Sequence, residues 1–554
     1  MLPTLQSRCR GFTALPLFAW ILSGCGLGAG EAQEFRGGFG TTTTGVFTSD
    51  AGDEDVSDEV GGFIFPEDFG GSGGGGGPGP GPTVEIPPNA CVPLSLLDER
   101  RSLIETNSAL LAPFSLRRAF ERVAINGGLT PGADTTHDLL IDHSNDAASA
   151  FVDAAGHCDD ELTDGSPSLN GFPLTCPRIE GQQIGNLDNW FPIAMVNRLD
   201  LAPADGAHCG EQRMIYANNS QGRMFIILEA QIPNPNPGCG VAACRPIAEM
   251  WAGLSDIDDV AQRRQILGSA FFGTHPALSA AGFPPFMRAQ HMSFGTGQLR
   301  TNNFDQFPWD LKEFKLVAGP GGRVVPEQVA VAANPFGPLL NDAFAHPLGP
   351  ACRTAFIDAI EGLVTDDVSL MALDMPAQCL AAESLDEFDN LYDFQISLGS
   401  QTFRDEIEAR AALLGNPLTA EQVGARAAFA GSCIGCHQQQ VGADLGNGIV
   451  GPFSQGFVHV DELFTQSCGA SGGQCFAISG ALDDHFLPTR HQAVLDVLAG
   501  CPDACGAAAP APFAGALTMP STSQSLAERR ALDIQARASH SKFTITGRPT
   551  AAVH

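Results

Sequence analysis

Apolar and polar positions along residues 89–400 predict helices first and strands afterwards. Apolar side chains recur at helical spacing over 94–112 and again over 116–125. Two runs rich in aliphatic residues follow, at 212–217 and 223–230, and the polar, glycine-containing segment between them predicts a β-hairpin. The pattern therefore mixes both kinds of element.

The rest of this region continues the mixture. Residues 247–267 predict a helix, because their apolar side chains fall on one face. A second pair of strands is predicted at 297–300 and 311–316, and further helices at 354–364 and 383–392. We therefore expect one α+β domain here, of unknown role.

The last part of the chain is predicted to be helical. Thr419 and Gln422 have the spacing of a capping box, so a helix should begin there. Another helix is predicted at 489–499, before a glycine that would stop it. Residues 401–510 are thus expected to form a small all-α domain, with 511–554 as a C-terminal extension.

The first 88 residues lack these patterns. Residues 26–88 are rich in glycine, proline and acidic side chains, and such a composition cannot bury enough apolar surface to fold. We expect 25–88 to be a disordered tether. Residues 1–24 contain two arginines and then an apolar run too short for a permanent membrane helix, which is typical of an export signal.

That signal ends in Leu22-Ser23-Gly24-Cys25, which resembles the lipobox of bacterial lipoproteins. The resemblance implies cleavage before Cys25 and attachment of lipid to its sulfur, and Gly26 implies sorting to the outer membrane. The alternative is an ordinary secretory signal in which Cys25 is incidental. Both alternatives place the mature chain outside the cytoplasm, and we expect a lipid-anchored envelope protein that faces the periplasm or the exterior.

The charge balance excludes one class of partner. The chain has 62 acidic and 30 basic residues, a formal net charge of −32. Without a basic patch it could not neutralise phosphates, so nucleic acid is not an expected partner. The acidic surface would keep the protein soluble and could steer basic partners toward it.

The 16 cysteines suit an oxidising compartment, where disulfides persist. Proximity along the chain suggests pairs, although spacing alone does not determine connectivity. Apart from Cys9, Cys25, Cys433 and Cys436, the suggested pairs are Cys158 with Cys176, Cys239 with Cys244, Cys352 with Cys379, Cys468 with Cys475, and Cys501 with Cys505, which leaves Cys91 and Cys209.

Cys433, Cys436 and His437 form the C-x-x-C-H pattern of c-type haem attachment. The two thiols would add to the haem vinyl groups, and the histidine that follows would donate a nitrogen to the iron. With 16 cysteines and 13 histidines, a chance occurrence is expected about 0.01 times in a chain of this length. A disulfide, a redox dithiol or half a zinc site are the alternatives. A βαβ context and a second matched Cys/His pair, which the last two need, are missing.

The surrounding residues resemble class I cytochrome c. Ala425, Phe429 and Cys433 repeat the family's small, aromatic and cysteine positions at four-residue steps, and Gly451-Pro452 resembles the loop after the family's histidine. The resemblance implies one covalent haem c and a Pro452 carbonyl that accepts a hydrogen bond from the far nitrogen of the haem histidine.

The chain departs from that family at the second axial ligand of the iron. No methionine lies between His437 and Met519. His485 occupies the family methionine's place in chain order, and His459 and Met519 are the other candidates. An open position is the remaining alternative, and it would suit binding of peroxide or a small gas.

Three functions follow from these observations. We expect a monohaem lipoprotein that carries electrons to or from a redox partner protein. The alternatives are a haem-dependent, peroxidase-like oxidoreductase with its substrate site in 89–400, and an envelope binding or structural protein with a haem module. The densest polar cluster of the middle domain has two explanations, a substrate site or buried ion pairs beside a disulfide; it comprises Arg198, His208, Glu211 and Arg213.

Overall fold

The computed structural model describes part of the chain, all of it within one compact unit, Val84–His554. The described residues are 97–547 with gaps at 146–156, 179–185, 219–222, 304–307, 386, 433–434, 436, 438–439, 456–457, 470–471, 500–518, 540 and 542. The predictions for 1–24, Cys25, the tether, Cys433 and Cys436 therefore lie outside the described residues. Among the described residues, no helix is long and apolar enough to span a bilayer.

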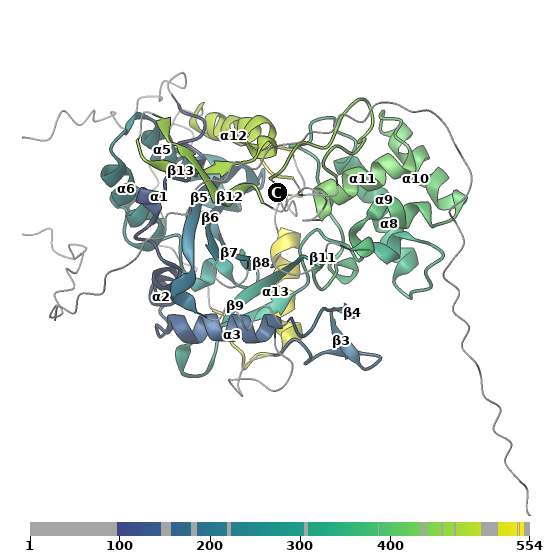
Figure 1. The fold of residues 1–554 in the computed structure, drawn as a ribbon, viewed down its shortest axis with the longest axis horizontal. Helices are drawn as coiled ribbons and strands as arrows, with labels where there is room; N and C mark the ends of the chain where they lie inside the picture. Colours follow the sequence, from purple (N-terminus) through teal and green to yellow (C-terminus); the bar gives the residue numbers. More distant parts are fainter. Residues whose placement is uncertain are drawn as a thin grey trace, which may run out of the picture. The chain divides into compact units, whose positions relative to one another are not determined.

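An eight-stranded antiparallel sheet forms the centre of this unit (Figure 1). Its order is β1-β5-β6-β7-β8-β9-β10, and β11 pairs with β9. The predicted hairpin is confirmed as β6 and β7, and the predicted second pair as β8 and β9. The strands are β1 (Ile104–Glu105), β5 (Phe191–Arg198), β6 (His208–Asn218), β7 (Met224–Pro233), β8 (Gln298–Asn303), β9 (Asp310–Ala318), β10 (Val324–Val329) and β11 (Ser384–Leu385).

The two faces of the sheet differ in chemistry, because side chains alternate along each strand. One row of cross-strand neighbours is entirely apolar: Met195, Met214, Leu228, Leu299 and Phe314. The adjacent row, on the opposite face, contains Val196, Arg213, Glu229 and Gln298. The sheet thus buries charge on one of its faces.

Helices cover the apolar face, where Trp251 of α5 donates to Gln212 of β6 at 2.7 Å. The helix predicted at 116–125 is confirmed, whereas the described part of the helix predicted at 94–112, residues 97–112, contains turns, the short strand β1 and one helical turn. The helix predicted at 247–267 is two helices, because Asp259 caps a new one. The helices on this side are α1 (Ser108–Leu111), α2 (Leu116–Asn126), α3 (Ala133–Asn145), α5 (Arg245–Ala252), α6 (Val260–Phe272) and α7 (Pro276–Ala280).

A second group of helices lies together on the other side of the molecule (Figure 1). The helix predicted at 383–392 is wrong: Ser384 pairs with β9 and the helix begins only at Tyr392. The group consists of α8 (Gly349–Ala359), α9 (Tyr392–Ser397), α10 (Gln401–Leu413) and α11 (Ala420–Gly431).

The structure does not show a separate all-α domain at 401–510. Within that range β12 (Val460–Ser467) and β13 (Gln474–Ile478) form a hairpin, and Cys475 bridges to Asn107 beside β1. The helix predicted at 489–499 is α12 (Leu487–Ala499), and it packs against α5. The haem motif and the sheet therefore belong to one mixed body.

Helix α11 packs closely against α9 at Gly424. A Cβ built there would lie 2.6 Å from the Asp393 Cα, so only glycine fits. We expect Gly424→Val to lower the free energy of unfolding by about 1–3 kcal/mol, because the backbones would have to move apart. Gly253→Val is the control, since a Cβ at Gly253 meets nothing within 4 Å; denaturant unfolding of the two variants would test this, and equal stabilities would contradict it.

The disulfides confirm most of the suggested pairs. Cys158–Cys176, Cys352–Cys379 and Cys468–Cys475 are formed. The suggested Cys239–Cys244 pair is wrong, because Cys244 bonds Cys209 across the start of β6. The suggestion for Cys501 and Cys505 lies outside the described residues.

Candidate functional site

Helix α11 begins as predicted and ends at Gly431, just before the C-x-x-C-H motif. Thr419 and Gln422 form the capping box at its start. At its end the Ser432 hydroxyl accepts from the Gly435 amide at 3.0 Å, and the Gly435 carbonyl accepts from Gln440 at 3.1 Å. A Cβ at Gly435 would lie 2.0 Å from the Ala428 carbonyl oxygen, so the turn that carries the motif needs glycine.

His437 lies against a second histidine. Its ring centroid is 4.3 Å from that of His459, and Trp309, just before β9, contacts it edge-on at 6.0 Å. Burial lowers the pKa of His437 to about 4, so the ring is neutral near pH 7 and can act as a metal ligand. Its Nδ1 is buried and has no hydrogen-bond partner among the described residues.

His459 is held by its surroundings. Its Nδ1 lies 2.7 Å from the Ser479 hydroxyl, and its carbonyl accepts from the Ser479 amide at 2.9 Å. Phe486 contacts the ring edge-on at 5.9 Å. A hydrogen bond at one ring nitrogen is typical of metal-ligating histidines, because it fixes the ring's orientation.

Both histidines line one cavity, which we call the imidazole cavity. The empty space within it, including its open mouth, is about 900 Å³. One wall is the charged face of the sheet, and the other comes from residues 458–490. Its apolar lining includes Ile104, Val196, Ile215, Phe225, Ile227 and Phe486, and its charged lining includes Arg198, Arg213, Glu229, Arg300 and Arg490.

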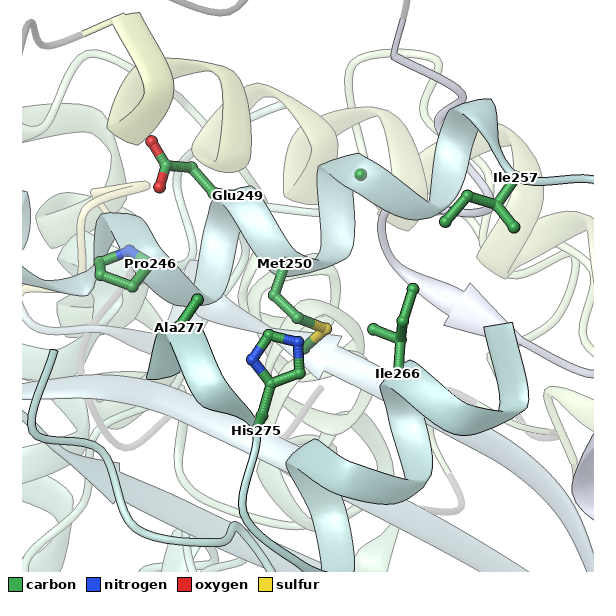
Figure 2. Close-up of a pocket in the computed structure, with 8 residues that line it drawn as sticks. Pro246, Glu249, Met250, Ile257, Ile266, His275 and Ala277 are labelled. Atoms are coloured by element: carbon green, nitrogen blue, oxygen red, sulfur yellow. The ribbon is translucent and has the colours of Figure 1, made fainter. Parts of the chain in front are cut away.

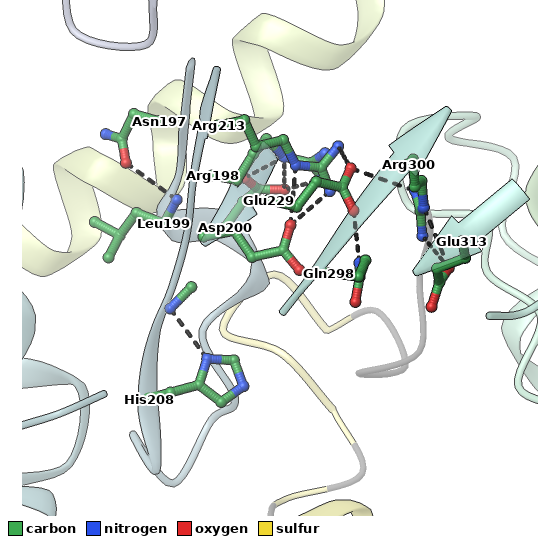
Figure 3. A network of polar contacts seen from close by, with 12 residues as sticks. Asn197, Arg198, Leu199, Asp200, His208, Arg213, Glu229, Gln298, Arg300 and Glu313 are labelled. Carbon is green, nitrogen blue, oxygen red and sulfur yellow. Dashed lines mark hydrogen bonds and ion pairs between the residues drawn. The ribbon is translucent and has the colours of Figure 1, made fainter. Parts of the chain in front are cut away.

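The polar cluster predicted in the middle domain forms buried ion pairs (Figure 3). Arg198 pairs with Asp200 at 3.0 Å, and Arg213 pairs with Glu211 at 2.6 Å. His208 accepts from the Gly210 amide at 3.2 Å, next to the Cys209 disulfide. These contacts fit the ion-pair explanation. The cluster nevertheless lines cavities, so the two explanations do not exclude each other.

The ion pairs continue across the sheet. Glu229 of β7 lies between Arg213 and Arg300, at 2.9 and 3.4 Å, and Arg300 also pairs with Glu313 at 3.1 Å (Figure 3). Gln298 donates to the second Glu229 oxygen at 2.5 Å. Glu229, Arg300 and Glu313 were not predicted as site residues, because each stands alone in its strand and only the register brings them together.

The remaining candidates lie in different places. His485 is exposed, whereas Met519 is partly buried against the core. Pro452 is buried in the loop after the motif. Since the His437 Nδ1 has no partner here, the role of Pro452 in orienting that ring stays a prediction.

A separate cavity lies between α5, α6 and α7 (Figure 2). It is lined by Met250, Ile266 and His275. The His275 Nδ1 accepts from the Leu278 amide at 3.4 Å and so caps α7, which gives this histidine a structural role.

Comparison with known proteins gives no relative: no family model, no curated protein and no solved structure matches this chain.

Proposed function

We propose that this chain is an exported, lipid-anchored monohaem c-type cytochrome that carries electrons. Haem c would be attached covalently to Cys433 and Cys436, and lipid to Cys25. His437 and His459 would be the two axial ligands. The observation that carries the proposal is the contact between the His437 and His459 rings inside a cavity with apolar walls.

The described residues include both ligands that such a group would need, but the two rings, with centroids 4.3 Å apart, would have to separate for one iron to bind between them. His437 belongs to the attachment motif, and burial keeps its ring neutral near pH 7, as a ligand to iron must be. His459 carries the supporting hydrogen bond expected of a ligand, and in that state its Nδ1–H donates to Ser479. Apolar residues from β1, β5, β6 and β7 would exclude water from the group's face.

The pair of histidines supports electron transfer, and not catalysis, as the function of the haem. Haem iron with two protein ligands supplies one-electron transfer and has no position open for a substrate. The protein would set the potential through both ligands and through the charges of Arg213, Glu229 and Arg300 in the cavity wall. The partner would be another redox protein of the cell envelope.

The test is removal of the second ligand. We expect His459→Ala to open the iron, so that the reduced protein binds carbon monoxide at least about tenfold faster than the wild type and its absorbance changes from a low-spin to a high-spin form. Stopped-flow mixing with carbon monoxide would measure this. His485→Ala is the matched control, because His485 is exposed and lies in the same segment.

A wild type that binds carbon monoxide as readily as His459→Ala would contradict this assignment. That outcome would favour the second candidate, a haem-dependent oxidoreductase. One observation supports that candidate: a polar cavity adjoins the imidazole cavity and shares Arg213 and Arg300 with it.

A further inference from the structure

The polar cavity beside the imidazole cavity is a built site, which we call the lysine cavity. It lies between the charged face of the sheet and α13 (Leu526–Ser539), and its empty space, including the open mouth, is about 1850 Å³. Its lining includes His208, Gln231, Thr296, Lys315, Arg530 and Asp533. We propose that it binds a small anion with carboxylate or other oxyanion groups.

The buried lysines of β9 provide the first observation. The chain has only three lysines, and two of them, Lys312 and Lys315, are buried in this strand. Lys312 has two carboxylate partners, Asp310 and Glu383. Lys315 instead donates to the carbonyls of Thr296 and Gly297 and to the Gln298 amide oxygen, at 2.9–3.2 Å.

The charge of Lys315 is therefore hydrogen-bonded but not neutralised by any described carboxylate within 4 Å. Its cross-strand neighbour Glu327 pairs with Arg529 of α13 at 2.6 Å. Glu313 lies two residues away on the same face and is ion-paired with Arg300. A cation that is about 5% exposed and lacks a counterion is costly, so an anion from solution would compensate it.

Helix α13 provides the second observation. The Nη2 of Arg530 is buried and has no hydrogen-bond partner among the described residues, and this side chain lines the cavity opposite the sheet. Contacts on both sides hold the helix in place, because Arg529 binds Glu327 and Asp533 accepts from the Gly295 amide. A guanidinium nitrogen without a partner is suited to an oxyanion.

The carboxylates of the cavity do not cancel these cations. Glu211 and Glu313 are already paired with Arg213 and Arg300. Asp374 is exposed at the rim, whereas Lys315 is buried. Asp533 also lines the cavity and accepts from the Gly295 amide, whereas Lys315 and Arg530 have no ion-pair partner within 4 Å among the described residues. This inference does not depend on the haem.

Isothermal titration of the exported full-length protein with sulfate, and separately with succinate, in a buffer of low ionic strength would test the proposal. We expect saturable binding of one anion per chain for at least one probe. Tighter binding of sulfate would indicate an inorganic oxyanion, and tighter binding of succinate a carboxylate. Since the net charge repels anions, non-specific binding would not saturate.

Arg530→Gln should weaken this binding at least tenfold, and Lys315→Met should have a similar effect. Arg404→Gln on α10 is the control, because that arginine binds only carbonyls and an amide of its own helix and the turn before it. Arg530 lies on a peripheral helix, so its variant gives a result even if Lys315→Met does not fold. Absence of saturable binding to both probes, or equal affinity in Arg530→Gln and wild type, would overturn the proposal.

Discussion

Haem absorbance that survives denaturation is expected to disappear from the exported protein when Cys433 and Cys436 are both replaced with alanine. Thioether bonds would be the only link that outlasts unfolding, because ligation by His437 and His459 depends on the folded cavity. The measurement is a pyridine haemochrome spectrum of purified protein, together with the intact mass, which should fall by one haem. Single variants should keep one thioether and give a shifted spectrum.

The disulfide Cys468–Cys475 offers a matched control for this experiment. Replacing both of these cysteines with alanine removes two sulfurs from the same half of the chain but leaves the motif intact, so covalent haem should be retained. Covalent haem in the Cys433/Cys436 double variant would exclude this assignment. A wild type without haem after export into a host that matures c-type cytochromes would exclude it as well.

Local patterns predicted those elements whose cause is local. The hairpin of β6 and β7 and the capping box at Thr419 depend on residues next to one another. The prediction failed at 97–112, the described part of the expected helix, where apolar residues at helical spacing form turns, the short strand β1 and one helical turn. It failed again at 384–385, because a pairing with β9 overrides the local preference for helix.

The site was predictable only in part for the same reason. The motif includes His437, but His459 lies 22 positions further along the chain, and only the fold shows that the two ring centroids are 4.3 Å apart. Trp309 and Ser479 belong to no sequence motif, so their contacts with His437 and His459 could not be predicted. The assumption of two independent domains was also misleading, since β12 contacts β5, β13 contacts α1, and α12 packs against α5.

That charged face links the two cavities through the same arginines. Arg213 and Arg300 line both the imidazole cavity and the lysine cavity, and Glu229 lies between them. A charge bound in one cavity would therefore change the electrostatic potential in the other, because the distance is short and the dielectric constant is low. An electron carrier with an anion site would have a potential that depends on the anion, whereas an enzyme would use the same arrangement to place a substrate near its redox centre.

Glu229→Gln is expected to lower the free energy of unfolding by about 1–3 kcal/mol, the loss typical when hydrogen bonds to a charged group are removed. Glu229 is fully buried and pairs with two arginines, and after the substitution Arg213 keeps Glu211 and Arg300 keeps Glu313 as a partner. Urea unfolding followed by circular dichroism would measure it. Glu249→Gln is the control, because that carboxylate is 46% exposed and its pair with Arg245 should contribute less than about 1 kcal/mol. In haem-loaded protein the same variant should also have a more positive midpoint potential, since a negative charge that favours the ferric state is gone. An unfolding free energy equal to that of Glu249→Gln would show that the ion pairs of Glu229 with Arg213 and Arg300 do not stabilise the sheet.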